Sequence, residues 1–122
     1  MQSNLSPSKN YAVRYIGEEV EVTIDRPIGS KHPKHGFVYE THYGFLPNTK
    51  APDREEIDAY VLGVTTPMKV FRGRCIAVIH RLDDDDDKLI VIPTSMKTLS
   101  DEEIRELTFF QEQFFTSEIV RE

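Results

Sequence analysis

Hydrophobic and polar residues alternate near the start of the chain. Between residues 20 and 25 every second position is apolar, and the apolar residues are Val20, Val22 and Ile24. Such a period of two is typical of a β-strand with one buried face, and Pro27 marks its end. The pattern therefore predicts a first strand over residues 20–25.

Four later segments also favour strands, because they are rich in aromatic, β-branched or other apolar residues and have turn residues beside them. These segments are 37–43, 57–64, 75–82 and 89–92. Tyr43-Gly44 and Pro47-Asn48 supply turn chemistry after the first of them, and Arg72-Gly73 supplies it before the third. Together with 20–25, they make five predicted strands.

One segment near the C-terminus predicts an α-helix. Ser100 can accept a hydrogen bond from a first-turn amide and Glu103 can answer three residues later, which is a capping box. Apolar residues then recur at helical spacing and predict a buried stripe of Ile104, Leu107, Phe110 and Phe114. We expect the helix to run from near Ser100 to near Phe115.

Five short strands followed by one helix indicate a mainly β (α+β) fold: a small OB-like five-stranded β-barrel with the C-terminal helix packed on its outside. A length of 122 residues predicts a single domain over 1–122, with 1–14 as a loosely ordered N-terminal extension.

Composition indicates the cellular compartment and the kinds of partner that we expect. Cys75 lies alone in an apolar run, which indicates a reducing compartment, and no stretch is typical of a signal peptide or a membrane span. A net charge of -6 disfavours nucleic acid as a partner. We therefore expect a cytoplasmic protein with no membrane or nucleic-acid partner.

Acidic residues gather in two places that favour a metal site. Asp53, Glu55 and Asp58 lie where a Pro-containing turn enters the strand at 57–64, and carboxylate oxygens are the ligands that Mg²⁺ prefers. Residues 83–87 are five consecutive aspartates, whose mutual repulsion requires cations or water. A solvated turn and an exposed hairpin tip are the alternative interpretations of these two segments.

A third group is basic and follows the first strand. The loop after Asp25 carries Arg26, Lys31, His32, Lys34 and His35, and Arg and Lys side chains bind phosphate oxygens. A basic surface loop without a ligand is the alternative interpretation of this segment.

The three groups, in this order, resemble the family I soluble inorganic pyrophosphatases from about Glu21 to Pro93. Residues 53–59 resemble the family signature, in which three Asp bracket a Pro or Glu and an apolar residue. Residues 39–45 look like its Tyr-Pro-x-Asn-Tyr-Gly segment, and residues 86–93 are similar to its Asp-x-Lys-apolar-strand-Pro segment. The resemblance implies an enzyme, a Mg²⁺-dependent hydrolase that cleaves inorganic pyrophosphate to two phosphates with a metal-activated water.

The resemblance also implies roles for single residues. It implies metal ligands at Asp25, Asp53, Asp58, Asp83 and Asp86, and phosphate contacts at Lys34, Tyr43 and Lys88. Glu55 stands where the family has an Asp that orients or deprotonates the attacking water, and Asp58 is the second catalytic position. We expect Asp53, Asp58, Asp83 and Asp86 to converge on one pocket at the mouth of the barrel.

The chain departs from the family pattern in its phosphate half. The family's hairpin between the positions of Lys34 and Tyr43 is shortened, one Arg has no counterpart, and the family's Tyr-Lys pair falls near Glu118-Ile119. Arg26, Lys31 and His32 are candidate substitutes, and we take Arg26 as a substrate-binding residue. The alternative function is a pyrophosphatase-fold protein that hydrolyses or only binds another phosphorylated small molecule. Excess Phe in 109–115 indicates a homo-oligomer.

Overall fold

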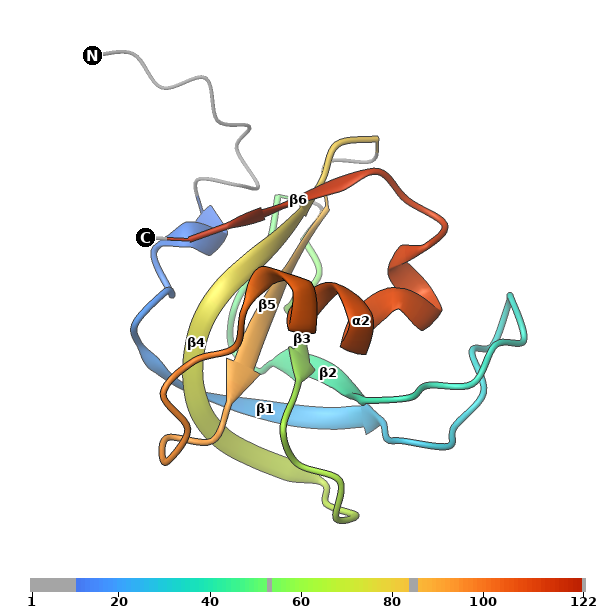
Figure 1. Cartoon of the computed structure of the whole chain (residues 1–122), viewed down its shortest axis with the longest axis horizontal. Coiled ribbons are helices and arrows are strands. Elements are labelled where there is room, and N and C mark those ends of the chain that lie inside the picture. Colours follow the sequence, from blue (N-terminus) through green and yellow to red (C-terminus); the bar gives the residue numbers. More distant parts are fainter. Residues whose placement is uncertain (1–10, 53, 84–85, 122) are drawn as a thin grey trace.

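Five strands close into a β-barrel in the computed structural model, which describes residues 11–52, 54–83 and 86–121 (Figure 1). The barrel strands are β1 (Glu19–Arg26), β2 (His42–Leu46), β3 (Ile57–Val61), β4 (Val70–Arg81) and β5 (Asp87–Ile92). They pair in the order β1-β2-β3-β5-β4, and β1 also pairs with β4. β3 and β5 run parallel, whereas the other pairs are antiparallel. The predicted five-stranded barrel is therefore confirmed.

The helix α2 (Asp101–Glu112) lies across the outer face of the barrel, as predicted (Figure 1). Side chains alternate along each strand, so neighbours such as Leu89 and Ile90 point to opposite faces. Leu89 packs in the cluster inside the barrel, and Ile90 packs in a second cluster with Ile104 and Phe110 of α2. The strands beneath the helix are therefore buried on both faces, which explains their continuous apolar runs.

The capping box at the start of α2 is present, but the predicted apolar stripe is only half correct. The Ser100 hydroxyl accepts from the Glu103 amide at 3.1 Å, and the Glu103 carboxylate accepts from the Ser100 amide at 2.8 Å. Leu107 and Phe114 are 38% and 59% exposed. The residues buried on α2 are Ile104, Thr108, Phe110, Gln111 and Glu112. Polar residues enter the buried face because Gln111 and Glu112 find hydrogen-bond partners on the barrel.

Strand β2 begins five residues later than predicted and contains Gly44 instead of ending before it. A Cβ atom on Gly44 would lie 1.9 Å from the Thr23 carbonyl oxygen of β1. The glycine therefore permits the close approach of two strands and does not form a turn. The turn after β2 is at Asn48, which has a φ of 64°.

Strand β4 begins at Val70 and includes Gly73, which the sequence placed in a turn. A Cβ atom on Gly73 would lie 2.3 Å from the Ile92 carbonyl oxygen of β5. The first part of β4 pairs with β1, and its later part pairs with β5. Gly73 thus lies where β4 bends from one partner to the other and closes the barrel.

A sixth strand, β6 (Ser117–Val120), was not predicted. It pairs with residues 78–81 of β4 and extends the sheet beyond the barrel. At the other terminus, Ala12 is fully buried against the barrel core, while residues 1–10 of the predicted N-terminal extension lie outside the described residues. No helix in the described part of the chain is long and apolar enough to cross a membrane.

The capping box makes Ser100→Ala a test of helix stability. Loss of the hydroxyl leaves the Glu103 amide without its acceptor, and we expect the free energy of unfolding to fall by about 1 kcal/mol. Urea denaturation measures the change, with the exposed Ser95→Ala as the control. An equal, small effect of both substitutions would show that the cap contributes nothing to stability.

Candidate functional site

A pocket of about 740 Å³ lies between one end of the barrel, the C-terminal end of α2 and the loop that joins β1 to β2. The five barrel strands each contribute to its lining, through Asp25, Arg26, Tyr43, Asp58, Arg81 and Lys88. The β1–β2 loop contributes His32, His35, Phe37 and Tyr39, and the segment at the end of α2 contributes Gln111, Phe114 and Phe115. In Figure 1 this loop projects beyond the barrel on the same side as the end of α2.

Three strand residues of the pocket, Asp58, Arg81 and Lys88, point away from the interior of the barrel. Asp58 and Lys88 are each two residues before a member of the outer cluster, Tyr60 and Ile90, and Arg81 is two residues after Ile79 of that cluster. Residues two apart in a strand share a face. The pocket therefore lies at one end of the barrel, on the side of the barrel wall that α2 covers.

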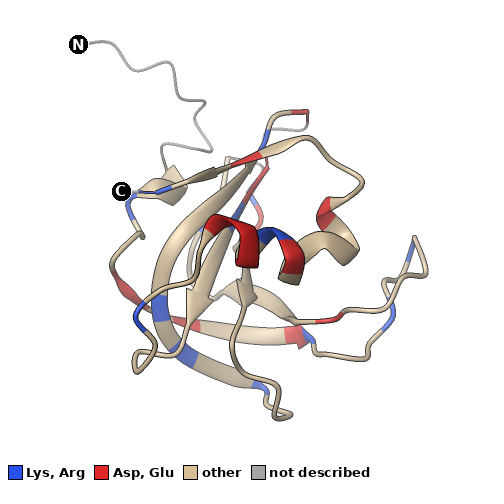
Figure 2. Ribbon diagram, viewed as in Figure 1, with Lys and Arg blue, Asp and Glu red and all other residues tan. Residues whose placement is uncertain are grey.

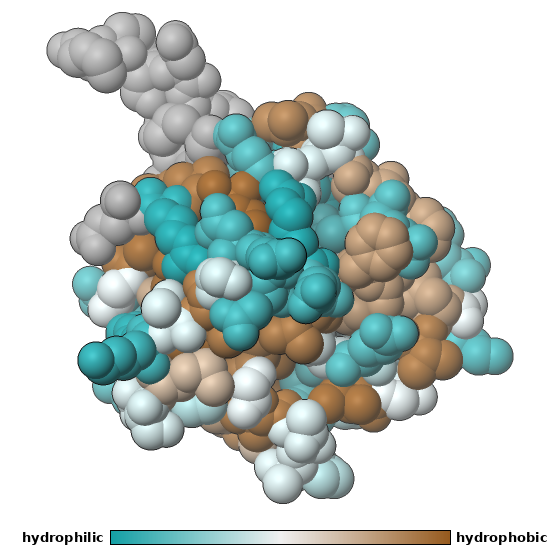
Figure 3. Space-filling view, viewed as in Figure 1, coloured by the Kyte–Doolittle hydropathy of each residue, from teal (hydrophilic) through white to brown (hydrophobic). Residues whose placement is uncertain are grey.

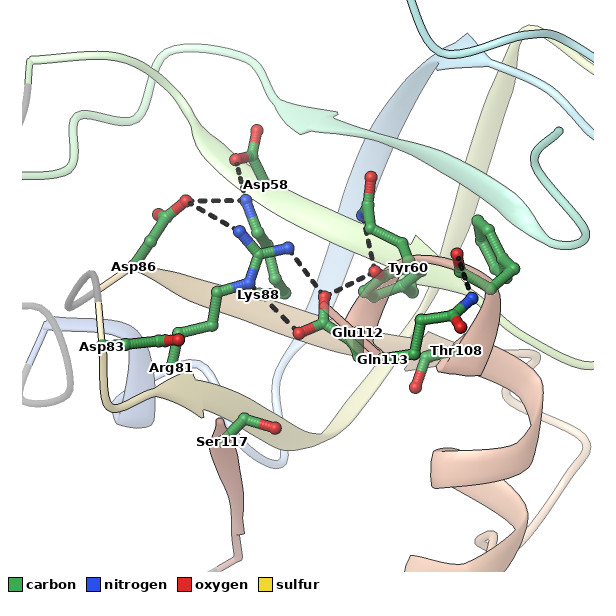
Figure 4. A network of polar contacts seen from close by, with 12 residues as sticks. Asp58, Tyr60, Arg81, Asp83, Asp86, Lys88, Thr108, Glu112, Gln113 and Ser117 are labelled. Carbon is green, nitrogen blue, oxygen red and sulfur yellow. Dashed lines mark hydrogen bonds and ion pairs between the residues drawn. The ribbon is translucent and has the colours of Figure 1, made fainter. Parts of the chain in front are cut away.

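Lys88 is the charged centre of this pocket. Asp58 and Lys88 are partners across the parallel pair β3–β5, and the Lys88 Nζ donates to Asp58 Oδ2 at 2.7 Å. The same Nζ donates to Asp86 Oδ2 at 2.8 Å (Figure 4). Burial opposes the charge of Lys88, but the Tyr43 hydroxyl and the two carboxylates outweigh burial and raise its pKa. The ammonium group is therefore retained at neutral pH.

Arg81 brings a second buried cation to the pocket, and sequence reasoning missed it. Its guanidinium donates to both carboxylate oxygens of Glu112, at 3.1 and 2.8 Å, and lies 3.6 Å from the centre of the Phe115 ring. Burial opposes its charge, but the hydrogen bonds that Arg81 donates to Glu112 and the negative charge of Glu112 outweigh burial and raise the pKa of Arg81. An arginine two residues after the apolar run of β4, which ends at Ile79, was the available signal.

A chain of hydrogen bonds connects this ion pair to the loop on the other side of the pocket. The Tyr60 hydroxyl donates to Glu112 at 2.6 Å, and the Gln111 amide donates to the Tyr60 oxygen at 2.6 Å (Figure 4). The Tyr39 hydroxyl donates to Gln111 at 3.1 Å. The end of α2 is therefore held in position by polar contacts on both sides, and it forms a rigid wall of the pocket.

Comparison with known proteins decides the family. The model of the family described as inorganic pyrophosphatase matches residues 7–119. The chain belongs to the inorganic pyrophosphatase family. The inorganic pyrophosphatase of Pseudomonas aeruginosa is 34% identical over 106 residues, which cover 84% of this chain and 59% of that protein. The inorganic pyrophosphatase of Rickettsia prowazekii is 33% identical over 120 residues, which cover 81% of this chain and 70% of that protein.

The chain spans only part of the length of the curated relatives that it matches. It spans 50% of inorganic pyrophosphatase 1 of Pseudomonas syringae, at 34% identity. Among solved structures, the inorganic pyrophosphatase of Helicobacter pylori superposes with a TM-score of 0.67 at 18% identity and covers 98% of this chain and 91% of its own. The inorganic pyrophosphatase of Ehrlichia chaffeensis superposes with a TM-score of 0.62 at 20% identity, and the match covers 95% of this chain and 90% of that one. These two structures confirm the family fold.

Five residues to which the sequence assigned a metal or substrate role line the pocket of this pyrophosphatase relative: Asp25, Arg26, Tyr43, Asp58 and Lys88. His32 and His35 of the basic loop line it as well. Burial raises the pKa of Asp25, and the negative charges of Asp58 and Glu56 add to this effect while Arg26 opposes it. Burial also raises the pKa of Tyr43, so its hydroxyl stays protonated. The pocket therefore holds both carboxylates and hydrogen-bond donors.

The remaining predicted site residues lie outside the lining of this pocket. Asp86 contacts it through Lys88, whereas Lys34 is exposed in the β1–β2 loop and Glu55 is exposed in the turn before β3. Asp83 is exposed and accepts from the Thr116 amide at 3.2 Å. Asp53 falls outside the described residues. No group of three or more His, Cys, Asp or Glu side chains that could hold a metal ion occurs within the described ranges.

Proposed function

We propose that this family member hydrolyses inorganic pyrophosphate to two phosphates with Mg²⁺. The carrying observation is the arrangement of Asp58 and Asp86 around the Nζ of Lys88, at 2.7 and 2.8 Å. The two carboxylates offer oxygen ligands to a metal ion, and the ammonium group between them can bind a phosphate oxygen. The family membership supports the same reaction.

The donor chemistry fits a divalent cation. The side chains of Asp58 and Asp86 are about one-third exposed, so a cation can reach their oxygens. We propose that these two residues hold the metal together with Asp25, Asp53 and Asp83. Bound Mg²⁺ lowers the pKa of a coordinated water and neutralises phosphate oxygens.

The chain's own cations then bind and orient the substrate. We propose that Lys88 and Arg26 contact phosphate oxygens, that Tyr43 donates a hydrogen bond, and that Lys34 approaches from the loop. Arg81 adds a further cation to the lining of the pocket. Glu55 would orient the attacking water, and Asp58 would help to hold the metal ion that activates this water.

A phosphate-release assay on the full chain tests the proposed function. With pyrophosphate and Mg²⁺ we expect release of two phosphates per pyrophosphate, and a chelator should abolish it because the carboxylates alone supply no Lewis acid. Magnesium titration by calorimetry provides an independent readout of the metal site. A chain that binds Mg²⁺ and cleaves no pyrophosphate would contradict the proposal.

A second candidate function is the hydrolysis or binding of another phosphorylated small molecule at the same pocket. The observation that favours it is the aromatic lining opposite the charged residues, which pyrophosphate itself would not contact. The homo-oligomer also remains a prediction: Leu107 and Phe109 of α2 are 38% and 60% exposed and offer an apolar surface.

A further inference from the structure

The pocket has two chemically different halves. One half carries the charged side chains of the strand ends, Asp25, Arg26, Asp58, Arg81 and Lys88. The other half carries aromatic rings from the β1–β2 loop and the end of α2: His32, His35, Phe37, Phe114 and Phe115. The charged half fits phosphate and metal ions, and the aromatic half fits neither.

The volume of the pocket also exceeds what pyrophosphate needs. Pyrophosphate is only two phosphate groups that share an oxygen, whereas the pocket measures about 740 Å³. Pockets of about 300–1,000 Å³ are typical of sites for larger organic ligands. Much of the pocket would therefore remain filled by water against aromatic rings if pyrophosphate were the whole ligand.

The aromatic half is an ordered arrangement of rings. The centroids of Phe37 and Phe114 are 5.8 Å apart with an angle of 23° between the planes, and those of His35 and Phe37 are 6.3 Å apart at 6°. The His32 ring lies 4.8 Å from Phe37. Phe114 is nevertheless 59% exposed, so much of its surface faces solvent. Stacked rings that end in the uncovered surface of Phe114 are a platform on which a planar ligand group can stack.

We propose that this pocket binds a nucleoside diphosphate, with the diphosphate at Lys88 and Arg81 and the base on the rings of Phe37 and Phe114. This inference rests on the proposed function, because it places the same phosphoanhydride group at the same charged residues. A nucleobase fits the rings better than a sugar, which has no π face. A diphosphate with an aliphatic tail is the competing ligand.

The reaction on such a ligand is the one already proposed for pyrophosphate. The water oxygen forms a bond to the terminal phosphorus, and the bond from that phosphorus to the bridging oxygen breaks. The bridging oxygen keeps the electron pair and stays on the nucleoside monophosphate, and the water's proton passes to solvent. The products are a nucleoside monophosphate and phosphate, and no oxidant or further reactant is required.

The test compares the affinities of ADP and pyrophosphate, each used as the analogue in which a methylene replaces the bridging oxygen so that it cannot be hydrolysed, measured by calorimetry on the full chain with Mg²⁺. We expect ADP to bind about tenfold more tightly than pyrophosphate. Phe114→Ala should reduce the ratio of the two affinities about tenfold, since stacking of a base on a ring contributes roughly that factor or more. Phe114→Tyr keeps a ring and should restore the ratio. Phe109→Ala removes an exposed ring of α2 outside this pocket and should leave both affinities unchanged.

The outcomes separate this inference from the proposed function. Two results would overturn the nucleotide inference even if pyrophosphate is cleaved. One is that ADP binds no more tightly than pyrophosphate. The other is that Phe114→Ala leaves the ratio of the two affinities as it is in the unaltered chain. Isopentenyl diphosphate that binds more tightly than ADP would also overturn it, in favour of an aliphatic ligand. Tight, Phe114-dependent binding of ADP in a chain that does not cleave pyrophosphate would support the inference and contradict the proposed function.

Discussion

Replacing Glu112 with alanine is expected to lower the free energy of unfolding by about 3–5 kcal/mol. Glu112 and Arg81 are both about 7% exposed, and the carboxylate accepts two hydrogen bonds from the guanidinium and one from Tyr60. Removal of one partner of a buried ion pair leaves the other charge in a poorly solvated place. Urea denaturation of the two proteins measures the difference.

The control for this prediction is Glu106→Ala, which removes the same charge from an exposed position of α2. We expect it to change stability by less than about 0.5 kcal/mol, as is usual for surface sites. A Glu112→Ala protein no less stable than this control would show that the buried network does not stabilise the fold.

A double substitution separates the net contribution of the Arg81–Glu112 ion pair to stability from the destabilisation caused by leaving one buried charge unpaired. When Arg81→Met and Glu112→Leu are combined, no charge stays buried alone, and most of the lost stability should return. Phosphate release by the double variant should remain low, because the pocket has lost Arg81. A double variant as unstable as Glu112→Ala would show that packing around these side chains, and not charge pairing, limits stability.

Local patterns predicted those elements of the fold that local physics determines. The alternation at 20–25 became β1, and the Ser100–Glu103 capping box begins α2. β6 was missed because its four residues are all half-buried and it exists through pairing with β4 far back in the sequence. Gly44 and Gly73 were interpreted as turn residues, because the close strand contacts that require glycine there appear only when the barrel closes.

The candidate site also contains residues that local motifs predicted and residues whose contacts depend on tertiary packing. Lys88, Asp58 and Tyr43 were singled out through motifs, and they meet because the register of β3 and β5 places Asp58 opposite Lys88. The pairing of Arg81 with Glu112 joins residues 31 positions apart and depends on how α2 lies on the barrel. No local pattern in the chain encodes that orientation, so the pairing of Arg81 with Glu112 could not be predicted.

The second large effect concerns Asp58, the pocket carboxylate that contacts Lys88. Asp58→Asn should lower the rate of phosphate release by about 10²-fold or more, because the neutral amide binds metal poorly and no longer balances the ammonium group. The affinity for Mg²⁺ should fall as well, and calorimetric titration measures it. The matched control is Glu56→Gln, which removes a charge from an exposed neighbour outside the pocket lining and should leave both quantities nearly unchanged.

Glu55→Gln separates the role of water activation from the role of metal binding at the same turn. If Glu55 orients the attacking water, this variant should lose about 10²-fold in turnover, the usual scale for a general base, while its Mg²⁺ affinity stays near that of the unaltered chain. Asp58→Asn, in contrast, should lose both turnover and Mg²⁺ affinity. Turnover of Glu55→Gln equal to that of the unaltered chain would assign the water to another group, and Asp53→Asn is then the variant to measure. Loss of Mg²⁺ affinity in Glu55→Gln would instead make Glu55 a metal ligand, since a general base that does not touch the ion has no effect on its binding.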